Sequence, residues 1–338
     1  MRASSLFMAL TLGLSTASAG FMPIDAQAQQ SPAAKRINRA IELLEQGQPV
    51  YYTQLYGGGY EEGVRLAATS ADYITYEMEN GAFDMSALRA FMQGLADAGR
   101  TRSGHRTPAV IVTLPIQGDD PVSMRANAWV AQQAMAAGVH GILLVHAQSV
   151  EAVRLFVEAV RYPFMAGVDP KASHRGWGNE LYASKIWGLS QTDYLRKADV
   201  WPLNPEGEVL LGIKIESPEG LAHAEELTKI PGIAFVEWGP GDQTMNLADH
   251  AKMFRLLEKQ PDGLPGYARA GKELDPELAA IEQRVRAAAK AANIAFLDMC
   301  LDESVIDQIK KGTMICASGN NVAVMEKGRT YTKRKMPW

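Results

Sequence analysis

Two acidic residues stand at the ends of two neighbouring apolar segments. Glu216 closes the segment 211–216 (LGIKIE), and Asp242 follows the segment 234–238 (AFVEW) after a Gly-Pro-Gly turn. Strand alternation places Lys214 and Glu216 on one face. On consecutive parallel strands, the two carboxylates would form an oxygen-rich site that suits Mg²⁺ or Mn²⁺. Such an ion could chelate a 2-oxo acid and act as a Lewis acid on its enolate.

Each carboxylate also has a structural alternative. Glu216 could stabilise the first turn of a helix that begins near Pro218. Asp242 could be an ordinary turn residue, because Gly-Asp is common in turns. Their spacing at the ends of two consecutive strands favours the metal site.

Short apolar segments alternate with helical patterns along the chain, which is typical of a parallel sheet. We expect strands at 50–55, 73–78, 109–114, 141–146, 209–216, 234–238, 294–299 and 313–317. We expect helices at 33–46, 85–98, 124–137, 150–160, 221–229, 276–292 and 303–310. Eight strands with intervening helices favour a closed (β/α)₈ TIM barrel, although an open eight-stranded sheet would give the same alternation.

One connection, about 163–208, is much longer than the others. It contains Trp177, Tyr182, Trp187, Tyr194 and Trp201, so we expect a packed loop over the end of the barrel that carries active sites. The basic segment from 328 onwards is expected to be peripheral, with 331–338 as a C-terminal tail.

The length of 338 residues suits one barrel, assigned to 33–330. A net charge of −4 gives no electrostatic basis for nucleic-acid binding. No organic cofactor is expected, and no Cys/His spacing matches a zinc site. Cys300 and Cys316 lie in apolar segments, where free thiols are the commoner state, although export would permit a disulfide.

The first 28 residues read as an export signal. Arg2 precedes the apolar run 6–14, and small-x-small sites end at Ala19 and Ala28. We prefer cleavage after Ala28; a buried N-terminal helix is the alternative. No later stretch approaches the roughly 20 apolar residues of a membrane span. The sequence therefore predicts a periplasmic or secreted protein.

Both acidic segments resemble the HpcH/HpaI aldolase/citrate lyase family, whose members carry a strand ending in Ile-Glu-(Ser/Thr)-Pro-Glu and a Gly-Pro-x-Asp-Leu turn. The resemblance covers about 36–328 and includes Tyr162-Pro, Arg175-Gly-Trp-Gly and the closing segment 314–319 (MICASG). It implies a barrel of the phosphoenolpyruvate/pyruvate-binding type and pyruvate-enolate chemistry. It also implies a Mg²⁺, Mn²⁺ or Co²⁺ ion and a trimeric or hexameric homo-oligomer, often with an exchanged C-terminal helix.

The chain departs from the family pattern at three positions. The segment 76–81 (YEMENG) has Asn80 where the family has a proton-relaying His. Asn cannot act as a general acid or base, whereas Glu77 or the catalytic candidate Glu79 could. Thr113 or Leu114 stands where a pyruvate-binding Arg is expected. Lys214 replaces a Gln two residues before the metal-binding Glu.

Lys214 could replace the missing Arg as a carboxylate or oxyanion partner, or serve as an acid–base group if its pKa falls. A Schiff-base role and a structural ion pair remain alternatives. The resemblance also makes Arg175 a catalytic candidate, against a loop-anchoring role. His146, at the end of the fourth strand, is a candidate for the displaced acid–base role, against a structural one.

Substrate-binding candidates are Gly239 and Pro240 of the metal turn, together with Trp238 and Trp177. Tyr52 and Tyr56 also belong to segments near the expected mouth. The family usually has an aliphatic residue where Trp238 stands, which indicates a larger apolar or aromatic substrate.

The sequence thus predicts a metal-dependent carbon–carbon lyase of the aldolase type that acts on a 2-oxo or hydroxy acid. One alternative uses the same site for ester or thioester hydrolysis or decarboxylation. The other is a periplasmic ligand-binding barrel without turnover.

Overall fold

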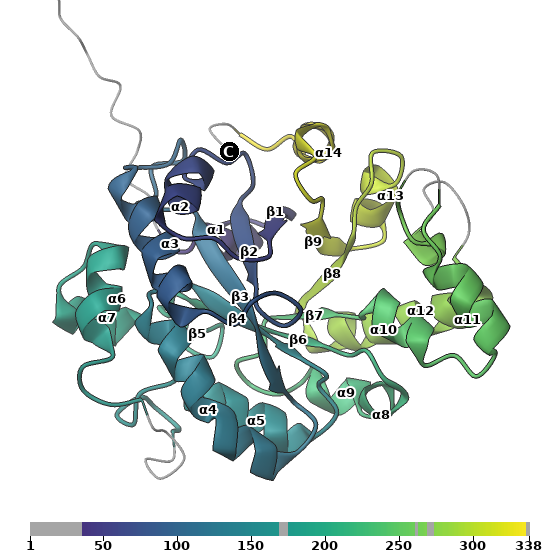
Figure 1. The fold of residues 1–338 in the computed structure, drawn as a ribbon, viewed down its shortest axis with the longest axis horizontal. Helices are drawn as coiled ribbons and strands as arrows, with labels where there is room; N and C mark the ends of the chain where they lie inside the picture. The colour runs from purple at the N-terminus through teal and green to yellow at the C-terminus, as the bar shows by residue number, and fades with distance from the viewer. Residues whose placement is uncertain (1–35, 169–174, 261–262, 269–273, 336–338) are drawn as a thin grey trace, which may run out of the picture. The chain divides into compact units, whose positions relative to one another are not determined.

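The fold is a closed parallel β-barrel surrounded by helices, as a computed structural model shows (Figure 1). The structure describes residues 36–168, 175–260, 263–268 and 274–335, all within the unit 31–338. The predicted signal segment 1–28 lies outside the described residues. Among those described, no helix combines the length and the hydropathy that crossing a membrane would need.

Eight parallel strands form the barrel, which closes between β4 and β6. They are β1 (Val50–Leu55), β2 (Tyr73–Glu77), β3 (Ala109–Gln117), β4 (Gly141–Val145), β6 (Val209–Lys214), β7 (Phe235–Glu237), β8 (Ala295–Met299) and β9 (Thr313–Ala317). A two-residue strand, β5 (Val200–Trp201), pairs with the start of β6 outside this ring. The predicted (β/α)₈ TIM barrel is confirmed, and the closure excludes the open sheet.

The surrounding helices follow the strands in chain order. They are α1 (Arg39–Glu45), α2 (Tyr60–Leu66), α3 (Met85–Asp97), α4 (Pro121–Ala136), α5 (Val150–Ala159), α6 (Glu180–Trp187), α7 (Gln191–Lys197), α8 (Pro218–Ala222), α9 (Ala224–Leu227), α10 (Pro240–Met245), α11 (His250–Leu257), α12 (Pro276–Ala292), α13 (Val305–Lys310) and α14 (Val322–Tyr331), with a 3₁₀ turn, η1, at Gly266–Ala268. Capping fixes several starts; for α3, the Asp84 side chain accepts from the N–H groups of Ser86 and Ala87.

Strand alternation sorts the apolar side chains into two layers. The barrel interior holds a cluster that includes Tyr52, Ile111 and Phe235. A larger cluster lies between the barrel and its helices and includes Ile74 and Ile213. Along each strand, every second residue counted from an interior position also faces inward. The last inward-facing residues of the strands therefore line the barrel mouth.

Three segments differ from expectation. The long connection contains α6, α7 and β5 rather than an irregular loop. Cys300 and Cys316 are joined in a disulfide instead of being free thiols, with Cα atoms 5.3 Å apart. The predicted peripheral segment after 328 begins inside α14, and its Arg329 and Arg334 are buried.

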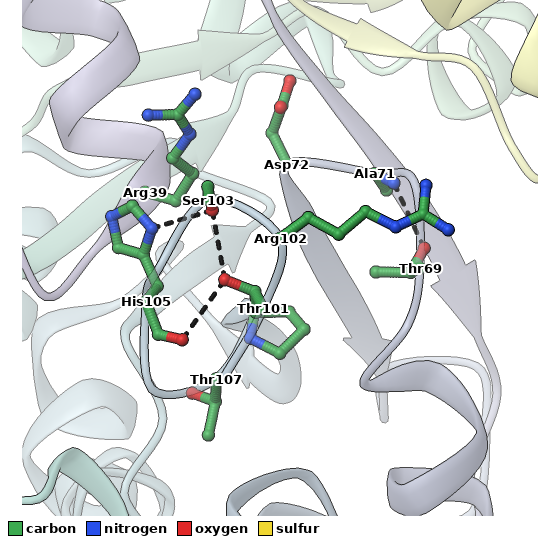
Figure 2. A pocket seen from close by; sticks show the side chains of 10 residues that line it. Arg39, Thr69, Ala71, Asp72, Thr101, Arg102, Ser103, His105 and Thr107 are labelled. Atoms are coloured by element: carbon green, nitrogen blue, oxygen red, sulfur yellow. Dashed lines mark hydrogen bonds between the residues drawn. The ribbon is translucent and has the colours of Figure 1, made fainter. Parts of the chain in front are cut away.

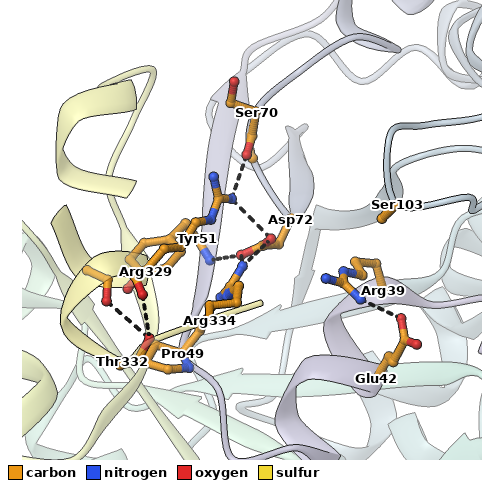
Figure 3. Close-up of polar contacts among 12 residues, drawn as sticks. Arg39, Glu42, Pro49, Tyr51, Ser70, Asp72, Ser103, Arg329, Thr332 and Arg334 are labelled. Carbon is orange, nitrogen blue, oxygen red and sulfur yellow. Dashed lines mark hydrogen bonds and ion pairs between the residues drawn. The ribbon is translucent and has the colours of Figure 1, made fainter. Parts of the chain in front are cut away.

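The N-terminal ends of the strands are closed by a charge network around Asp72, which directly precedes β2 (Figure 3). Arg329 and Arg334 donate to its carboxylate at 3.1 and 2.7 Å, and the Tyr51 N–H donates at 2.9 Å. Arg334 also donates to the Pro49 carbonyl. These bonds fasten the C-terminal helix to the start of β1 and β2.

A second network lies beside it, around a small polar cavity of about 20 Å³ (Figure 2). Nδ1 of the His105 ring and the Ser103 hydroxyl share a hydrogen bond of 2.9 Å, and Nε2 of the same ring lies 3.0 Å from the Glu42 carboxylate. Arg39 donates to the same Glu42 carboxylate at 2.7 Å. The N-terminal end of the barrel thus pairs its buried charges with one another.

Candidate active site at the barrel mouth

Lys214 is the cation at the centre of the mouth. It ends β6 on the inward face, and its Nζ donates to Glu79 Oε2 at 2.6 Å. Its register partner on β7 is Glu237. Burial opposes its charge, but Glu237, Glu216 and Glu79 together raise the pKa of Lys214 above its ordinary value. Lys214 is therefore held as an ammonium.

Glu216 lies just beyond Lys214 on the same face and is 1% exposed. Its Oε1 accepts the backbone N–H of His146 at 2.7 Å, whereas its buried Oε2 has no hydrogen-bond partner. Burial raises the pKa of Glu216 to about 8; Glu237 and Asp242 act in the same direction, and Lys214 and His146 oppose them. An acceptor oxygen in this state is expected to take up a cation or a proton.

His146 follows β4 and adopts φ 47°, a left-handed conformation that is uncommon for a residue with a side chain. This conformation directs its N–H at Glu216. Its ring nitrogens lie 3.4 Å (Nδ1) from Glu216 Oε1 and 3.9 Å (Nε2) from Glu79 Oε1. The local strain is thus tied to the placement of the most buried carboxylate of the mouth.

The predicted metal turn supports Glu216 by close backbone packing. Gly239 has φ 55°, and a Cβ there would lie 2.3 Å from Cβ and 2.7 Å from Oε2 of Glu216. Only glycine fits this position. Pro240 and Asp242 form the first turn of α10, where Asp242 is half-buried and adds negative charge near Glu216.

Three side chains could hold a metal ion together. One ligand atom each from Glu79, His146 and Glu216 lies within 4.8 Å of the others. Two carboxylates and an imidazole suit a divalent cation, and the partnerless Oε2 of Glu216 supplies a buried oxygen for it. Asp242 is outside this group of three. The donor set therefore fits a metal. Glu216 was a predicted ligand, whereas Glu79 and His146, which the sequence indicated only as catalytic candidates, join it in this group.

Glu77 and Glu237 are two further acidic residues of the mouth; the sequence named Glu77 only as an alternative acid–base group and did not indicate Glu237. Glu77 accepts the backbone N–H groups of Glu79 and Asn80 at 2.7 and 3.2 Å. Burial raises the pKa of Glu237, and Glu79, Asp298 and Glu77 add to the effect against Lys214. Strand alternation was the signal that could have found both residues, since each ends its strand on the inward face.

Several predicted site residues lie elsewhere. The Asn80 side chain is exposed. Thr113 is an exception, because it is the register partner of Glu77 and has a buried hydroxyl without a hydrogen-bond partner. Trp177 is 81% exposed. The Trp238 indole points out of the barrel, where its Nε1 donates to Asp298 at 3.0 Å.

Arg175 is fully buried away from the mouth. Its guanidinium donates to the carbonyls of Val160 and Ala198 and to the Tyr194 hydroxyl, and it lies 4.2 Å over the Tyr162 ring. These contacts join α5 to the connection after it, which favours the loop-anchoring role. The two tyrosines predicted near the mouth lie in different places. Tyr52 packs against Tyr73 inside the barrel with the rings tilted by 30°, and Tyr56 is 63% exposed.

Comparisons with known proteins agree with this architecture. No family model matches the chain. A hydroxypyruvate/pyruvate aldolase of Pseudomonas aeruginosa is 28% identical over 241 residues, which are 70% of each chain. A protein of the same name from Delftia acidovorans is 30% identical over 177 residues, and the match spans about half of each chain, 52% and 54%.

Solved structures show the same fold. An HpcH/HpaI aldolase/citrate lyase family protein from Burkholderia cenocepacia superposes with a TM-score of 0.61 at 20% identity, covering 87% of this chain and 97% of its own. An HpcH/HpaI aldolase from Desulfitobacterium hafniense gives 0.58 at 17% identity, covering 88% and 97%. The resemblance to this family is thereby confirmed, and the aldolase relatives support a lyase-type activity.

Proposed function

We propose that this chain, whose fold neighbours are HpcH/HpaI family proteins and whose curated relatives are hydroxypyruvate/pyruvate aldolases, is a divalent-metal-dependent carbon–carbon lyase. Its substrate is a 2-oxo acid or related hydroxy acid, and the reaction passes through an enolate. The observation that carries the proposal is the buried, partnerless oxygen of Glu216 beside Glu79, His146 and the ammonium of Lys214.

Glu216, Glu79 and His146 are the residues that would hold Mg²⁺ or Mn²⁺, with Co²⁺ as a third candidate and Asp242 beside them. When bound, such an ion polarises the oxygens of a 2-oxo acid and stabilises negative charge on them. Three carboxylates, those of Glu79, Glu216 and Glu237, surround the single ammonium of Lys214. A divalent cation would therefore also relieve the repulsion among these carboxylates.

Lys214 supplies the positive charge that the absent family Arg would have provided. Its raised pKa favours a permanent ammonium, which can pair with the substrate carboxylate or with the enolate oxygen. A Schiff base requires an unprotonated amine, so the same raised pKa opposes that alternative.

Glu237 is the group that we propose to move the proton. Its register position places it beside Lys214 at the mouth, and burial raises its pKa, which makes the carboxylate a stronger base. In cleavage, a base removes the hydroxyl proton of a 4-hydroxy-2-oxo acid, the C3–C4 bond breaks, and an aldehyde and an enolate result. The enolate carbon then takes up a proton to give the 2-oxo acid.

We also propose that the protein is exported, as the N-terminal segment predicts. The Cys300–Cys316 disulfide supports this proposal, because structural disulfides persist mainly in oxidising compartments.

Exchange of the methyl protons of pyruvate with D₂O, followed by ¹H NMR, tests the enolate step without knowledge of the second substrate. We expect exchange with added Mn²⁺ and a loss of at least about 100-fold after EDTA treatment or in Glu216→Gln. The control Glu219→Gln, on the same helix start but exposed, should exchange normally.

Calorimetric titration with Mn²⁺ separates binding from turnover. Wild type should bind the ion and Glu216→Gln should not. Exchange that persists without metal would contradict the proposal, and metal binding without any exchange would favour the ligand-binding barrel.

A further inference from the structure

A cavity of about 670 Å³ lies outside the barrel wall, between α12 and α13 at the ends of β7 and β8. Its size is within the range of pockets that bury a ring-containing small molecule. The lining reaches from the metal turn to the far end of α13 and includes Pro240, Tyr267 and Met299 next to the mouth. The proposed chemistry uses none of this space.

The wall nearest the mouth is aromatic and apolar. Trp238 follows β7 directly, and its indole is held by the hydrogen bond from Nε1 to Asp298 at 3.0 Å. Tyr267 and Leu274 line the same side and are half-buried. Trp238 is only 3% exposed, so its indole forms the closed back of this wall. The half-buried Tyr267 is the aromatic side chain that a bound ring can contact.

Tyr267 connects this cavity to the mouth. Its hydroxyl would lie 3.3 Å from a Cβ at Gly241, one residue from Asp242. Burial raises the pKa of Tyr267, and the charges of Asp242 and Glu237 raise it further. The phenol thus lines the cavity next to the turn that carries Asp242, which places this end of the cavity beside the mouth.

The rest of the lining is acidic, from Asp298 beside Trp238 to Glu303 and Asp307 near α13. Glu282 and Asp298 are both bonded to Arg286, which neutralises part of their charge. Glu303 and Asp307 are exposed on the cavity side of α13, and Lys310 pairs with Asp307 at 3.2 Å. The basic lining residue, Lys311, comes after the last turn of α13, at the end remote from the mouth. This charge distribution repels phosphate and carboxylate groups.

We propose that this cavity receives the half of the substrate that is not the 2-oxo acid, and that this half is an aromatic group that is uncharged or positively charged. The proposal rests on the lyase function proposed above, for which it specifies the aldehyde partner. An aromatic aldehyde would place its ring against Tyr267 and Leu274 and its carbonyl towards the mouth. The acidic lining disfavours partners that carry phosphate.

Three matched probes test the pocket by binding, independently of turnover. They are benzyl alcohol, benzyltrimethylammonium and phenylacetate, titrated calorimetrically into the full chain. We expect phenylacetate to bind at least 10-fold more weakly than either of the others.

Two pairs of substitutions locate the effect. Glu303→Lys with Asp307→Lys should reverse the preference between phenylacetate and benzyltrimethylammonium, and Glu303→Gln with Asp307→Asn should remove it. The control pair Glu151→Lys with Glu226→Lys changes equally exposed charges on α5 and α9 and should leave the preference intact. Binding at the acidic mouth instead of the cavity would make all these proteins alike, which would overturn the proposal.

Exchange of pyruvate methyl protons, measured on the same proteins, distinguishes the two proposals. It should be unchanged in every pair, since none touches the mouth. If the wild type exchanges pyruvate methyl protons but binds the three probes equally well, only the assignment of the cavity is overturned. Absence of exchange in the wild type overturns the lyase function and, with it, the assignment of the cavity to a lyase substrate.

Discussion

Asp72 and Glu216 are both buried carboxylates at the ends of barrel strands, but their surroundings differ. At the N-terminal end, Asp72 accepts bonds from Arg329, Arg334 and a backbone N–H. At the mouth, Glu216 has one buried oxygen without a partner and other carboxylates as neighbours. The N-terminal end is thus organised for stability, and the mouth keeps its charges available for a ligand. Four substitutions test this contrast.

Asp72→Ala should have the largest effect on stability. It leaves Arg329 and Arg334 buried without their shared carboxylate, and breaking such a cluster costs about 3–5 kcal/mol. Urea unfolding at pH 7 measures the loss, with the exposed Asp119→Ala as control. A change below about 1 kcal/mol would show that the charge network does not hold α14 in place.

Gly239→Ala should cost about 3 kcal/mol, because it adds a left-handed alanine and a Cβ that overlaps Glu216. That overlap displaces Glu216, the proposed metal ligand. The exchange of pyruvate methyl protons with D₂O should therefore also fall at least about 10-fold. Gly241→Ala, in the same turn but 3.3 Å from its nearest neighbour, is the control for both measurements. Normal exchange in Gly239→Ala would mean that the position of Glu216 is not critical.

Glu216→Gln should stabilise the metal-free protein at high pH. The raised pKa of about 8 means that the native state favours the protonated carboxyl. Wild type therefore has this contribution in full below about pH 4.5 and loses it as the pH rises through 8. Unfolding in EDTA at pH 5, 6.5 and 8.5 should show the variant gaining on the wild type. If the stabilities of the variant and the wild type instead change in parallel with pH, the pKa of Glu216 is not raised in the native state.

Glu42→Gln should show the opposite pH dependence at the other end, with the smallest effect. Burial raises the pKa of Glu42, but His105 and Arg39 more than offset this and lower it to about 2. Its contribution is therefore present above about pH 4.5 and is lost as the pH falls towards 2. The variant should be less stable than wild type at pH 7 and equal to it near pH 2. The exposed Glu61→Gln should match the wild type throughout.

The barrel could be predicted from the sequence because its strands are short apolar segments with turn residues between them. All eight predicted segments coincide with barrel strands. The helices α2, α6, α7, α10, α11 and α14 were not predicted, because each spans ten residues or fewer and so repeats a helical period over few turns. The disulfide depends on the proximity of β8 to β9, which spacing alone does not specify.

The site was harder to predict than the fold. Strand alternation predicts that Lys214 and Glu216 face the mouth. The position of His146 instead depends on its left-handed backbone conformation, which no local sequence pattern predicts. Trp238 was assigned to the mouth because it precedes the metal turn, yet the strand places it on the outward face. Arg175 was assigned through the family resemblance, and its contacts lie with Tyr162 and Tyr194 instead.

The attachment of α14 has a consequence for the order of folding. Arg334 bonds Asp72 across 262 positions of sequence, and the barrel pairs its last strand with its first. Contacts of such long range form late and slowly, so the nascent chain cannot complete its barrel until its final residues have been synthesised. A chain shortened by removal of 332–338 loses the Arg334 bonds altogether. Its strand ends would remain open to aggregation, whatever the state of its active site.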